Sequence, residues 1–558
     1  MDFQRIAILL GLAVISYLLI LAWNDDYGSQ ATKDVVVQSE TPVFTNSVDD
    51  VPTTIPTGEI GNVVPQLEEE ISGQQTTITR TTTNNYITVK TDVLEVTIDL
   101  KGGDIVKVAL PKYPANIDTP DVPFILVDPR NNYSSQSGLI GPDGIDKSGK
   151  RPLLQSSLQA YDLGNNDELN VELTLPGDNR LKVVKQFVFR RGDYLIDVNY
   201  LLNNNTSVDA QVAFFSQIKR DGQSPKGQET NAMGLRPFVG GATRTDDELY
   251  KKLDFDDIEE ENYKSKIEGG YMAMVQHYFV SAWVPGGTGA FSYQARKLPN
   301  QDTYLFGFTT PLMTVIPGGS GKIGAQYYVG PKDQYRLEEI ADGLNLTVDY
   351  GFLWWLAQPL FSLLTFIHGL VNNWGIAIIL LTVIVKSLLF PLSAASFRSM
   401  AKMRKLQPEM ARLKERFGDD KQKFSQAMME LYKKEGANPL GGCFPILLQM
   451  PVFLALYWTL MESVELRQAP FILWINDLSV MDPYFVLPIL MGGSMFLTQM
   501  MQPEPPDPVQ AKVFKMMPIM FTFFFLWFPS GLVLYWLVNN LLSLAQQLYV
   551  TRQIEKAG

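Results

Sequence analysis

The stretch WGIAIILLTVIVKSLLFPL, from Trp374 to Leu392, decides the fold because it is long and apolar enough to cross a membrane. Nineteen helical residues at about 1.5 Å each extend roughly 28 Å, close to the thickness of a hydrocarbon core. One charge, Lys386, lies three residues past the centre of this stretch, and no Asp or Glu lies within the apolar run of any predicted span to neutralise it. A lone intramembrane charge indicates a functional site, although packing against a structural partner is the simpler alternative.

Charge is unevenly distributed along the chain. The whole sequence has 558 residues and a formal net charge of −12. Residues 24–340 hold 43 acidic and 29 basic side chains, whereas residues 341–558 hold 15 and 17. Because cytoplasmic loops of membrane proteins are rich in Lys and Arg, we expect the acidic part to be exported and the basic loops to be cytoplasmic. The single cysteine, Cys443, excludes an internal disulfide and a C-x-x-C metal site.

The N-terminal region predicts a membrane anchor. Arg5 precedes an apolar run that ends at Trp23, and this run is longer than the apolar region of a cleavable signal peptide. We therefore predict an uncleaved transmembrane anchor at residues 1–23, with the N-terminus in the cytoplasm. Residues 24–80 are rich in Thr, Ser, Pro and acidic side chains without periodicity, which predicts a disordered periplasmic linker.

Residues 81–341 change to a period of two, which is typical of β-strands. Apolar side chains recur at alternate positions in residues 94–100, 181–189 and 194–200, and the first and third of these segments run into Gly or Asn turns. Repeated short strands predict a large antiparallel β-sandwich in the periplasm. His277 is the only histidine of this region, so a His-cluster metal site is excluded. We expect a binding or scaffolding module, and a Tyr- or acid-lined carbohydrate cleft stays open as an alternative.

The last third, residues 342–558, predicts five more spans. They are residues 374–392, 443–461, 484–500, 513–528 and 532–550. With the anchor they make six spans and place both termini in the cytoplasm. Residues 352–370 are also apolar enough to cross, but a span there would place the following basic loop outside. That loop, residues 392–437, has 11 basic and 6 acidic side chains, so we predict that 352–370 lies along the periplasmic interface.

The basic loop predicts a cytoplasmic helical hairpin at residues 395–435. Its apolar side chains are spaced three or four residues apart, and Pro408 is expected to kink the first helix. Three methionines on these apolar stripes, Met403, Met410 and Met428, suit an adaptable surface for varied apolar client segments. Simple packing of the two helices on each other is the alternative.

Several long motifs lie between residues 341 and 552. They are Asp349-Tyr350-Gly351, Asn372-Asn373-Trp374-Gly375, Met400-Ala401-Lys402-Met403-Arg404, Asn438-Pro439-Leu440-Gly441-Gly442-Cys443-Phe444-Pro445, Gln449-Met450-Pro451, Val464-Glu465-Leu466-Arg467-Gln468-Ala469-Pro470 and Phe528-Pro529-Ser530-Gly531-Leu532. These motifs resemble the YidC/Oxa/Alb family of membrane protein insertases. The predicted anchor and β-domain resemble the form of the family found in Gram-negative bacteria.

This resemblance implies a hydrophilic groove that is enclosed by the five core spans and is open to the cytoplasm and the lipid. One positive charge lies in the family's groove, and Lys386 occupies that place, where the family more usually has arginine. We expect Thr382, one helical turn before Lys386, and Gln449 to line the groove, and Tyr535 and Trp536 to contact the client. The resemblance also implies that the periplasmic domain is a β-supersandwich similar to sugar mutarotases, without their catalysis.

The sequence therefore predicts a polytopic α-helical protein of the inner membrane, with six spans and a large periplasmic all-β supersandwich domain. Its expected function is to insert and fold nascent inner-membrane proteins, alone or with the Sec translocon and its accessory subunits, without chemical catalysis. Other expected partners are the ribosome and the lipid bilayer, with no nucleic-acid sequence recognition. Tail-mediated ribosome contact is expected to be weak, because the C-terminal tail contains only Arg552, Glu555 and Lys556 as charges.

No cofactor or metal is expected, and no G-x-x-x-x-G-K-[ST] nucleotide motif is present. Two other classes of function remain as alternatives. An ion-coupled transporter could use Lys386, but proton relays usually employ acidic side chains, and none lies within the predicted spans. A membrane-anchored periplasmic sugar receptor would leave the last third of the chain unexplained.

Overall fold

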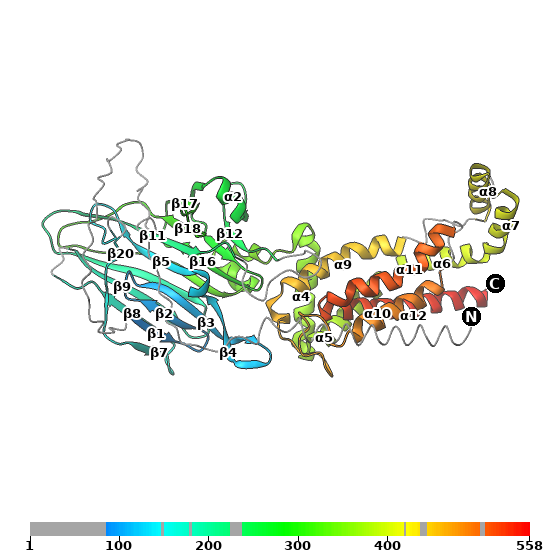
Figure 1. Ribbon diagram of the computed structural model, residues 1–558, viewed down its shortest axis with the longest axis horizontal. Helices are drawn as coiled ribbons and strands as arrows, with labels where there is room; N and C mark the ends of the chain where they lie inside the picture. Colours follow the sequence, from blue (N-terminus) through cyan, green and yellow to red (C-terminus); the bar gives the residue numbers. More distant parts are fainter. Residues whose placement is uncertain are drawn as a thin grey trace. The chain divides into compact units, whose positions relative to one another are not determined.

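The computed structural model describes residues 85–146, 150–177, 181–223, 237–417, 420–435, 444–502 and 508–557. The predicted anchor at 1–23 and linker at 24–80 lie outside the described residues. The described chain divides into two compact units (Figure 1). One is a β-domain that ends at Val348, and the other is a helical unit that begins at Asp349.

Two sheets build the β-domain. The first contains β14 (Tyr263–Glu268), β17 (Ala290–Lys297), β18 (Tyr304–Thr309), β11 (Ala210–Arg220), β5 (Ser134–Ile140), β3 (Asp104–Asn116), β2 (Glu95–Asp99), β1 (Tyr86–Lys90) and β7 (Ala160–Asp162) in that order, with β4 (Thr119–Val127) beside β3 and β19 (Met313–Val315) beside β11. The second contains β13 (Lys251–Leu253), β12 (Gly240–Thr243), β15 (Met272–Val275), β16 (Phe279–Pro285), β20 (Ser320–Pro331), β10 (Leu195–Asn204), β9 (Leu181–Arg190), β8 (Glu168–Thr174) and β6 (Gln155–Ser156). The strand pairs are antiparallel, apart from β1 with β7. Two short helices, α2 (Phe255–Glu260) and α3 (Gln334–Ile340), complete the domain.

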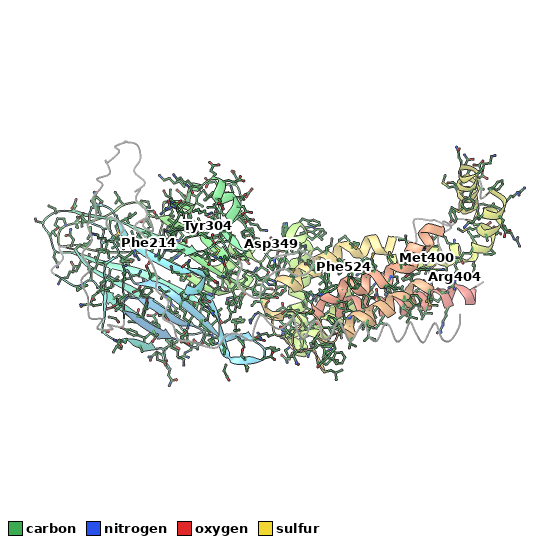
Figure 2. All side chains as sticks on the ribbon, viewed as in Figure 1. Phe214, Tyr304, Asp349, Met400, Arg404 and Phe524 are labelled. Atoms are coloured by element: carbon green, nitrogen blue, oxygen red, sulfur yellow. The ribbon has the colours of Figure 1, made fainter. Side chains whose placement is uncertain are left out.

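Side chains from both sheets meet in one core, so the predicted β-sandwich is confirmed. Phe214 of β11, which is labelled in Figure 2, packs edge-on against Trp283 of β16, with ring centroids 6.3 Å apart, and against Tyr200 of β10 at 5.9 Å. The predicted alternation in β9 is also observed, since the side chains from Leu181 to Phe189 are buried at every second position. Lys185 lies in this buried row.

Lys185 belongs to a buried polar cluster between the sheets. Its Nζ donates to the carbonyl oxygens of Gly102 and Ser137, at 3.0 and 3.2 Å. Arg151 forms ion pairs with Asp104 and, at 2.6 Å, with Asp146. Burial lowers the pKa of Lys185 to about 7 and raises the pKa of Asp146. The cluster thus places titratable groups in the interior of the sandwich.

The helical unit is built from helices that follow the apolar stretches of the sequence. They are α4 (Trp354–Val371), α5 (Trp374–Leu388), α6 (Phe390–Lys405), α7 (Gln407–Phe417), α8 (Lys421–Lys434), α9 (Phe444–Glu462), α10 (Val486–Met500), α11 (Pro508–Phe524) and α12 (Ser530–Ala557). Short 3-10 turns precede α4 (Gly351–Leu353), follow α9 (Val464–Leu466) and follow α11 (Phe525–Trp527). Helix α12 packs against α5, α6, α9 and α10, and α4 packs against α5 and α9.

The first predicted core span differs from the structure at its C-terminal end. Helix α5 ends at Leu388, four residues before the predicted end, and the chain bends by 67° into α6. Pro391 lies in the first turn of α6, where it lacks an N–H group and cannot extend the preceding helix. Lys386 therefore lies in the last turn of α5, and not near the middle of one straight helix as the hydropathy pattern suggested. Pro408 has a similar effect, because the helix stops at Lys405 and α7 begins at Gln407.

By length and hydropathy, Gly351–Val371 could cross a membrane, and α5 and α6 pass the same test together as one bent pair. Helix α10 is apolar but shorter. Since this test covers only the described residues, the count of six spans stays a prediction. Helix α4 exposes Trp354 and Trp355 beside Gln358 and Ser362. Such a mixed aromatic and polar face is typical of the headgroup layer, so its interfacial position also stays a prediction.

Candidate functional site

Lys386 is held where α5 and α12 pack together. Its side chain is only 7% exposed, and its Nζ donates to Ser543 Oγ of α12 at 2.8 Å. Ser543 in turn donates to the backbone oxygen of Asn539 at 2.7 Å. Because Lys386 lies in the last turn of α5, its positive charge also faces the negative end of that helix dipole. Both interactions stabilise the ammonium group without neutralising its charge.

An acidic partner for Lys386 is missing from the part of the chain that the structure describes. An ammonium group has three donors, and the hydroxyl of Ser543 occupies one of them. Two amide oxygens on the same stretch of α12, Asn539 Oδ1 and Gln546 Oε1, are buried and have no hydrogen-bond partner among the described residues. The surroundings of Lys386 therefore have spare capacity to donate and to accept, which a polar peptide segment or water can use.

Thr382 lies on the same buried face of α5, one turn before Lys386. Its hydroxyl donates to the carbonyl oxygen of Ile378 at 2.6 Å. In this structure the hydroxyl group is therefore satisfied by its own helix. It lines the α5 face but makes no described bond to Lys386.

The remaining predicted site residues form a second group, between α9 and α12. Gln449 donates to the hydroxyl of Tyr535 at 2.6 Å, and Tyr535 is buried. Trp536 packs edge-on against Phe453 of α9, with ring centroids 4.4 Å apart. Tyr535 precedes Ser543 by eight residues, about 12 Å along a helix. The predicted residues therefore share α12 but do not form one cluster.

Three residues around Lys386 were not predicted from the sequence, namely Asn539, Ser543 and Gln546. All three lie on α12 and recur at intervals of four and three residues. This spacing places them on one helical face. A polar stripe within an otherwise apolar helix was the signal that could have identified them.

Two of the three predicted hairpin methionines contact a tyrosine of α8. Met403 is buried with Leu406, and Tyr432 packs against both. The Tyr432 hydroxyl lies 3.5 Å from Met410 Sδ. This packing is what the structural alternative expects of Met403 and Met410. Met428 is half-buried, whereas its neighbour Met429 is 66% exposed.

Helix α6, at the base of the hairpin, packs on the C-terminal half of α12. Met400 and Phe397 of α6 are buried with Val550 of α12, and Figure 2 marks Met400 on this helix. Helix α12, which carries the polar residues near Lys386, is therefore in direct contact with the base of the hairpin.

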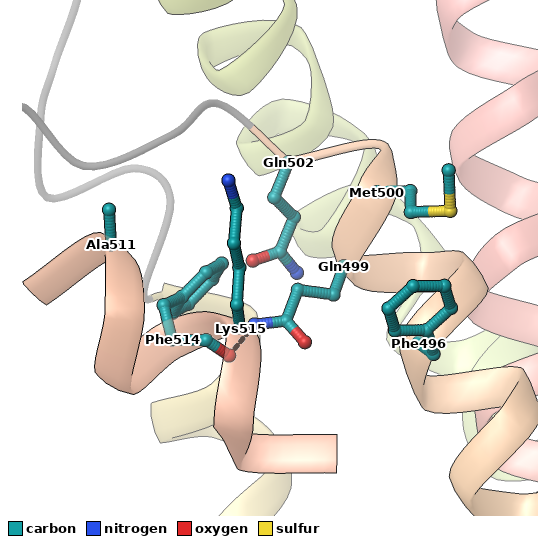
Figure 3. A pocket seen from close by; sticks show the side chains of 7 residues that line it. All are labelled: Phe496, Gln499, Met500, Gln502, Ala511, Phe514 and Lys515. Atoms are coloured by element: carbon teal, nitrogen blue, oxygen red, sulfur yellow. Dashed lines mark hydrogen bonds between the residues drawn. The ribbon is translucent and has the colours of Figure 1, made fainter. Parts of the chain in front are cut away.

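A small cavity of about 80 Å³ lies between α10 and α11 (Figure 3). It is lined by Phe496, Gln499, Met500, Gln502, Ala511, Phe514 and Lys515. Gln499 donates to the backbone oxygen of Phe514 across it. This volume suits a few water molecules and is too small for a peptide segment, so we do not assign the cavity to a client.

Both units of the chain match models of known protein families. Residues 366–557 match the family model of the 60Kd inner membrane protein, and residues 86–363 match that of the YidC periplasmic domain. The chain is 51% identical to a membrane protein insertase YidC of Cellvibrio japonicus (strain Ueda107), with 100% of this chain and 99% of the relative aligned. A membrane protein insertase YidC of Ectopseudomonas mendocina (strain ymp) is 50% identical with the same coverage.

Among solved structures, a crystal structure of an active YidC insertase with its first transmembrane domain resolved covers 83% of this chain and 92% of its own, with a TM-score of 0.38 and 18% identity. The relatives are named for insertion, which is not a chemical reaction. The full-length identities and the two family models agree. The chain belongs to the YidC family of inner-membrane protein insertases, with a periplasmic domain.

Proposed function

We propose that this chain inserts and folds inner-membrane proteins, and that the polar outer segment of a client is attracted by Lys386. The observation that carries this proposal is the environment of Lys386, a nearly buried ammonium group that is held by a neutral hydroxyl at 2.8 Å. A charge held in this way attracts a transient acidic partner. The amide oxygens of Asn539 and Gln546, which have no hydrogen-bond partner among the described residues, can accept hydrogen bonds from the backbone N–H groups of a client.

The energy for insertion comes from the client. Burying its apolar segment in lipid releases about 25 cal/mol for each Å² of apolar surface. The membrane potential adds about 2.3 kcal/mol per elementary charge per 100 mV for acidic residues that move outward. The protein therefore needs to lower the barrier for the polar segment, and it needs no nucleotide.

Helix α11 offers a surface along which the apolar segment of the client leaves. Large apolar side chains on several sides of this helix are exposed; they include Val513, Met516, Ile519, Met520 and Phe523. Tyr535 and Trp536 lie on the neighbouring α12, where Trp536 contacts Phe525 at the end of α11 with ring centroids 5.3 Å apart. Together these side chains form an apolar route that begins beside the polar groups of α12.

The remaining assignments follow from the charge distribution and belong to the same proposal. Six spans place both termini and the hairpin in the cytoplasm and the β-domain in the periplasm. The hairpin, through the half-buried Met428 and the exposed Met429, covers an incoming apolar segment. The protein acts on its own for small clients, and works beside the Sec translocon and the ribosome for larger ones.

Photocrosslinking to a stalled client tests the proposal. A photoreactive phenylalanine derivative at position 449, where the native Gln449 bonds to Tyr535, should crosslink to the polar segment of a single-span client. The same derivative at position 541, where the native Leu541 is exposed on α12, serves as the matched control and should crosslink mainly to lipid. Equal client yields from the two positions would contradict the proposal.

A further inference from the structure

The loop between α9 and α10, residues 463–485, concentrates backbone strain. Six residues other than glycine have a positive φ in the described chain, and three of them are asparagines. The other three, Gln468, Leu473 and Phe485, all lie in this loop, with φ between 56° and 58°. Side chains with a Cβ avoid this left-handed region, and residues held there often serve a function.

Hydrogen bonds fix this loop against the start of α5. Asn373, which caps α5, donates from its Nδ2 to the carbonyl oxygen of Phe471 at 3.0 Å. The Phe471 ring lies against Gly375, where a Cβ would overlap it. The N–H of Phe471 also donates to the carbonyl oxygen of Ile475 at 2.9 Å, which closes a tight turn. The turn is therefore held at the level of the first turn of α5.

A second set of contacts fixes the other half of the loop. The N–H groups of Ser530 and Gly531, at the start of α12, donate to the carbonyl oxygens of Val480 and Leu478, at 2.7 and 2.9 Å. The Trp474 indole N–H donates to Asp482 at 2.9 Å. The loop thus has anchors on both sides and does not move as a free connection.

The tip of this fixed turn is apolar and exposed. Ile475 and Leu478 are buried under the loop, whereas Ile472 is 52% and Leu473 is 80% exposed. Exposed apolar side chains continue from the loop into α10 through Tyr484, Ile489 and Leu490. The loop has a small buried core, formed by Ile475 and Leu478, but the side chain of Leu473 does not enter it. The strained backbone at Leu473 therefore accompanies a leucine side chain that points outward.

We propose that Ile472 and Leu473 insert into the boundary between headgroups and acyl chains of the outer leaflet. This inference rests on the proposed function, because the proposed six-span topology places the end of α9 and the start of α10 on the periplasmic side. The apolar surface that faces lipid on α10 then continues onto the tip, and the Trp474 and Tyr484 rings, with centroids 6.3 Å apart, suit the same layer. The tip anchors the outer loop in lipid beside the start of α5.

Fluorescence quenching in vesicles tests this insertion. In full-length protein with Cys443→Ser, single cysteines from Leu473→Cys, Leu490→Cys and Val208→Cys are labelled with an environment-sensitive NBD probe. Val208 is the matched control, because it is 63% exposed and apolar but lies in the β-domain. The vesicles contain phosphatidylethanolamine and phosphatidylglycerol, with a nitroxide quencher placed either high or deep on the acyl chain.

The proposal predicts that the probe at 473 has blue-shifted emission relative to the probe at 208. It also predicts stronger quenching of this probe by the shallow nitroxide than by the deep one, and weak quenching by iodide in the water. Emission at 473 that matches emission at 208, with lipid quenching intact at 490, would overturn only the insertion of the tip. Loss of lipid quenching at 490 as well would overturn the proposed topology together with this inference. A probe from Ile472→Cys repeats the test at a residue with ordinary backbone geometry.

Discussion

At the scale of single residues, Lys386 places a charge in the apolar helix α5, and the partner of this charge is a neutral hydroxyl group. Its ammonium group is nearly buried and bonds to Ser543 Oγ at 2.8 Å. Taking such a charge out of water is unfavourable unless other groups compensate. One hydroxyl and the end of a helix dipole compensate in part for the lost hydration of this charge. The approach of an acidic group therefore stabilises it further. Lysine also lacks the planar fork of arginine, so attraction and not bidentate pairing is the expected interaction.

Substitution of Lys386 should affect clients according to the charge of their outer segment. Lys386→Arg should support insertion. Lys386→Ala should reduce insertion of clients with acidic outer tails by roughly tenfold, since the attraction between two unit charges about 4 Å apart is about 1–4 kcal/mol. Clients with neutral tails are the control and should be affected least. Protease protection of the client tail measures the outcome. Equal losses for acidic and neutral tails would show that Lys386 has a structural role.

Lys185 should make the stability of the β-domain depend on pH. Burial lowers the pKa of Lys185 to about 7 in the folded protein, so between about pH 7 and pH 10 the unfolded chain binds a proton that the folded chain lacks. The free energy of unfolding should therefore increase as the pH rises through this window. Burial raises the pKa of Asp146 in the folded protein. The free energy of unfolding should therefore decrease as the pH rises from the ordinary pKa of an Asp carboxyl towards the raised pKa of Asp146.

Lys185→Met tests this dependence, because Arg151 still donates to the carbonyl oxygens of Gly102 and Ser137. The variant should lose the slope above pH 7 and gain roughly 2–4 °C in the melting temperature of the β-domain at pH 7, the shift expected for about 1 kcal/mol in a domain of this size. Thermal unfolding of the full-length protein in detergent at several pH values measures both. A slope that is unchanged in the variant would assign the pH dependence to other groups.

At the scale of elements, the structure shows what periodicity predicts well and what it does not. The alternation in β9 and the apolar runs of α9 and α10 follow from local burial, so the sequence predicted these elements within a few residues. The bend at Leu389 was not predicted, because the three residues that follow it, Phe390, Pro391 and Leu392, continue the apolar run of α5. The bond from Lys386 to Ser543 could not be predicted, since it joins residues 157 positions apart and depends on how α5 packs on α12.

The hairpin methionines should separate into two groups when they are replaced by aspartate. Met403→Asp and Met410→Asp place a charge against Tyr432, so they should destabilise the hairpin by roughly 2–3 kcal/mol and expose it to protease. Met429→Asp changes an exposed side chain and should leave the hairpin folded but reduce client transfer. Limited proteolysis and an insertion assay on the same samples distinguish the two effects. Normal transfer by Met429→Asp would remove this surface from the client pathway.

At the scale of the whole molecule, the residues that we propose to act in insertion lie in the helical unit. Lys386, its partners on α12 and the hairpin all follow Asp349, where the helical unit begins. The two family models also divide the chain close to this point, at residues 363 and 366. The β-domain has a complete core of its own, formed by both sheets. This division predicts that insertion itself does not depend on the β-domain.

Removal of the β-domain should therefore leave insertion largely intact. Deleting residues 86–348 and joining the ends by a short flexible linker keeps the predicted anchor and the entire helical unit. We expect the rate of insertion of a small single-span client to fall less than roughly threefold, a change of under about 1 kcal/mol in the barrier. A variant that is stably expressed and correctly oriented but inserts nothing would contradict this division of labour.

A charge exchange in liposomes tests whether Lys386 attracts the client by its charge. The purified full-length protein is reconstituted alone with a single-span client that has an acidic outer tail, and insertion is measured by protease protection. We expect Lys386→Glu to insert this client poorly, and to insert a matched client with lysines in place of the acidic residues at a clearly higher rate. Equal insertion of both clients by the native protein and by Lys386→Glu would contradict electrostatic attraction at Lys386.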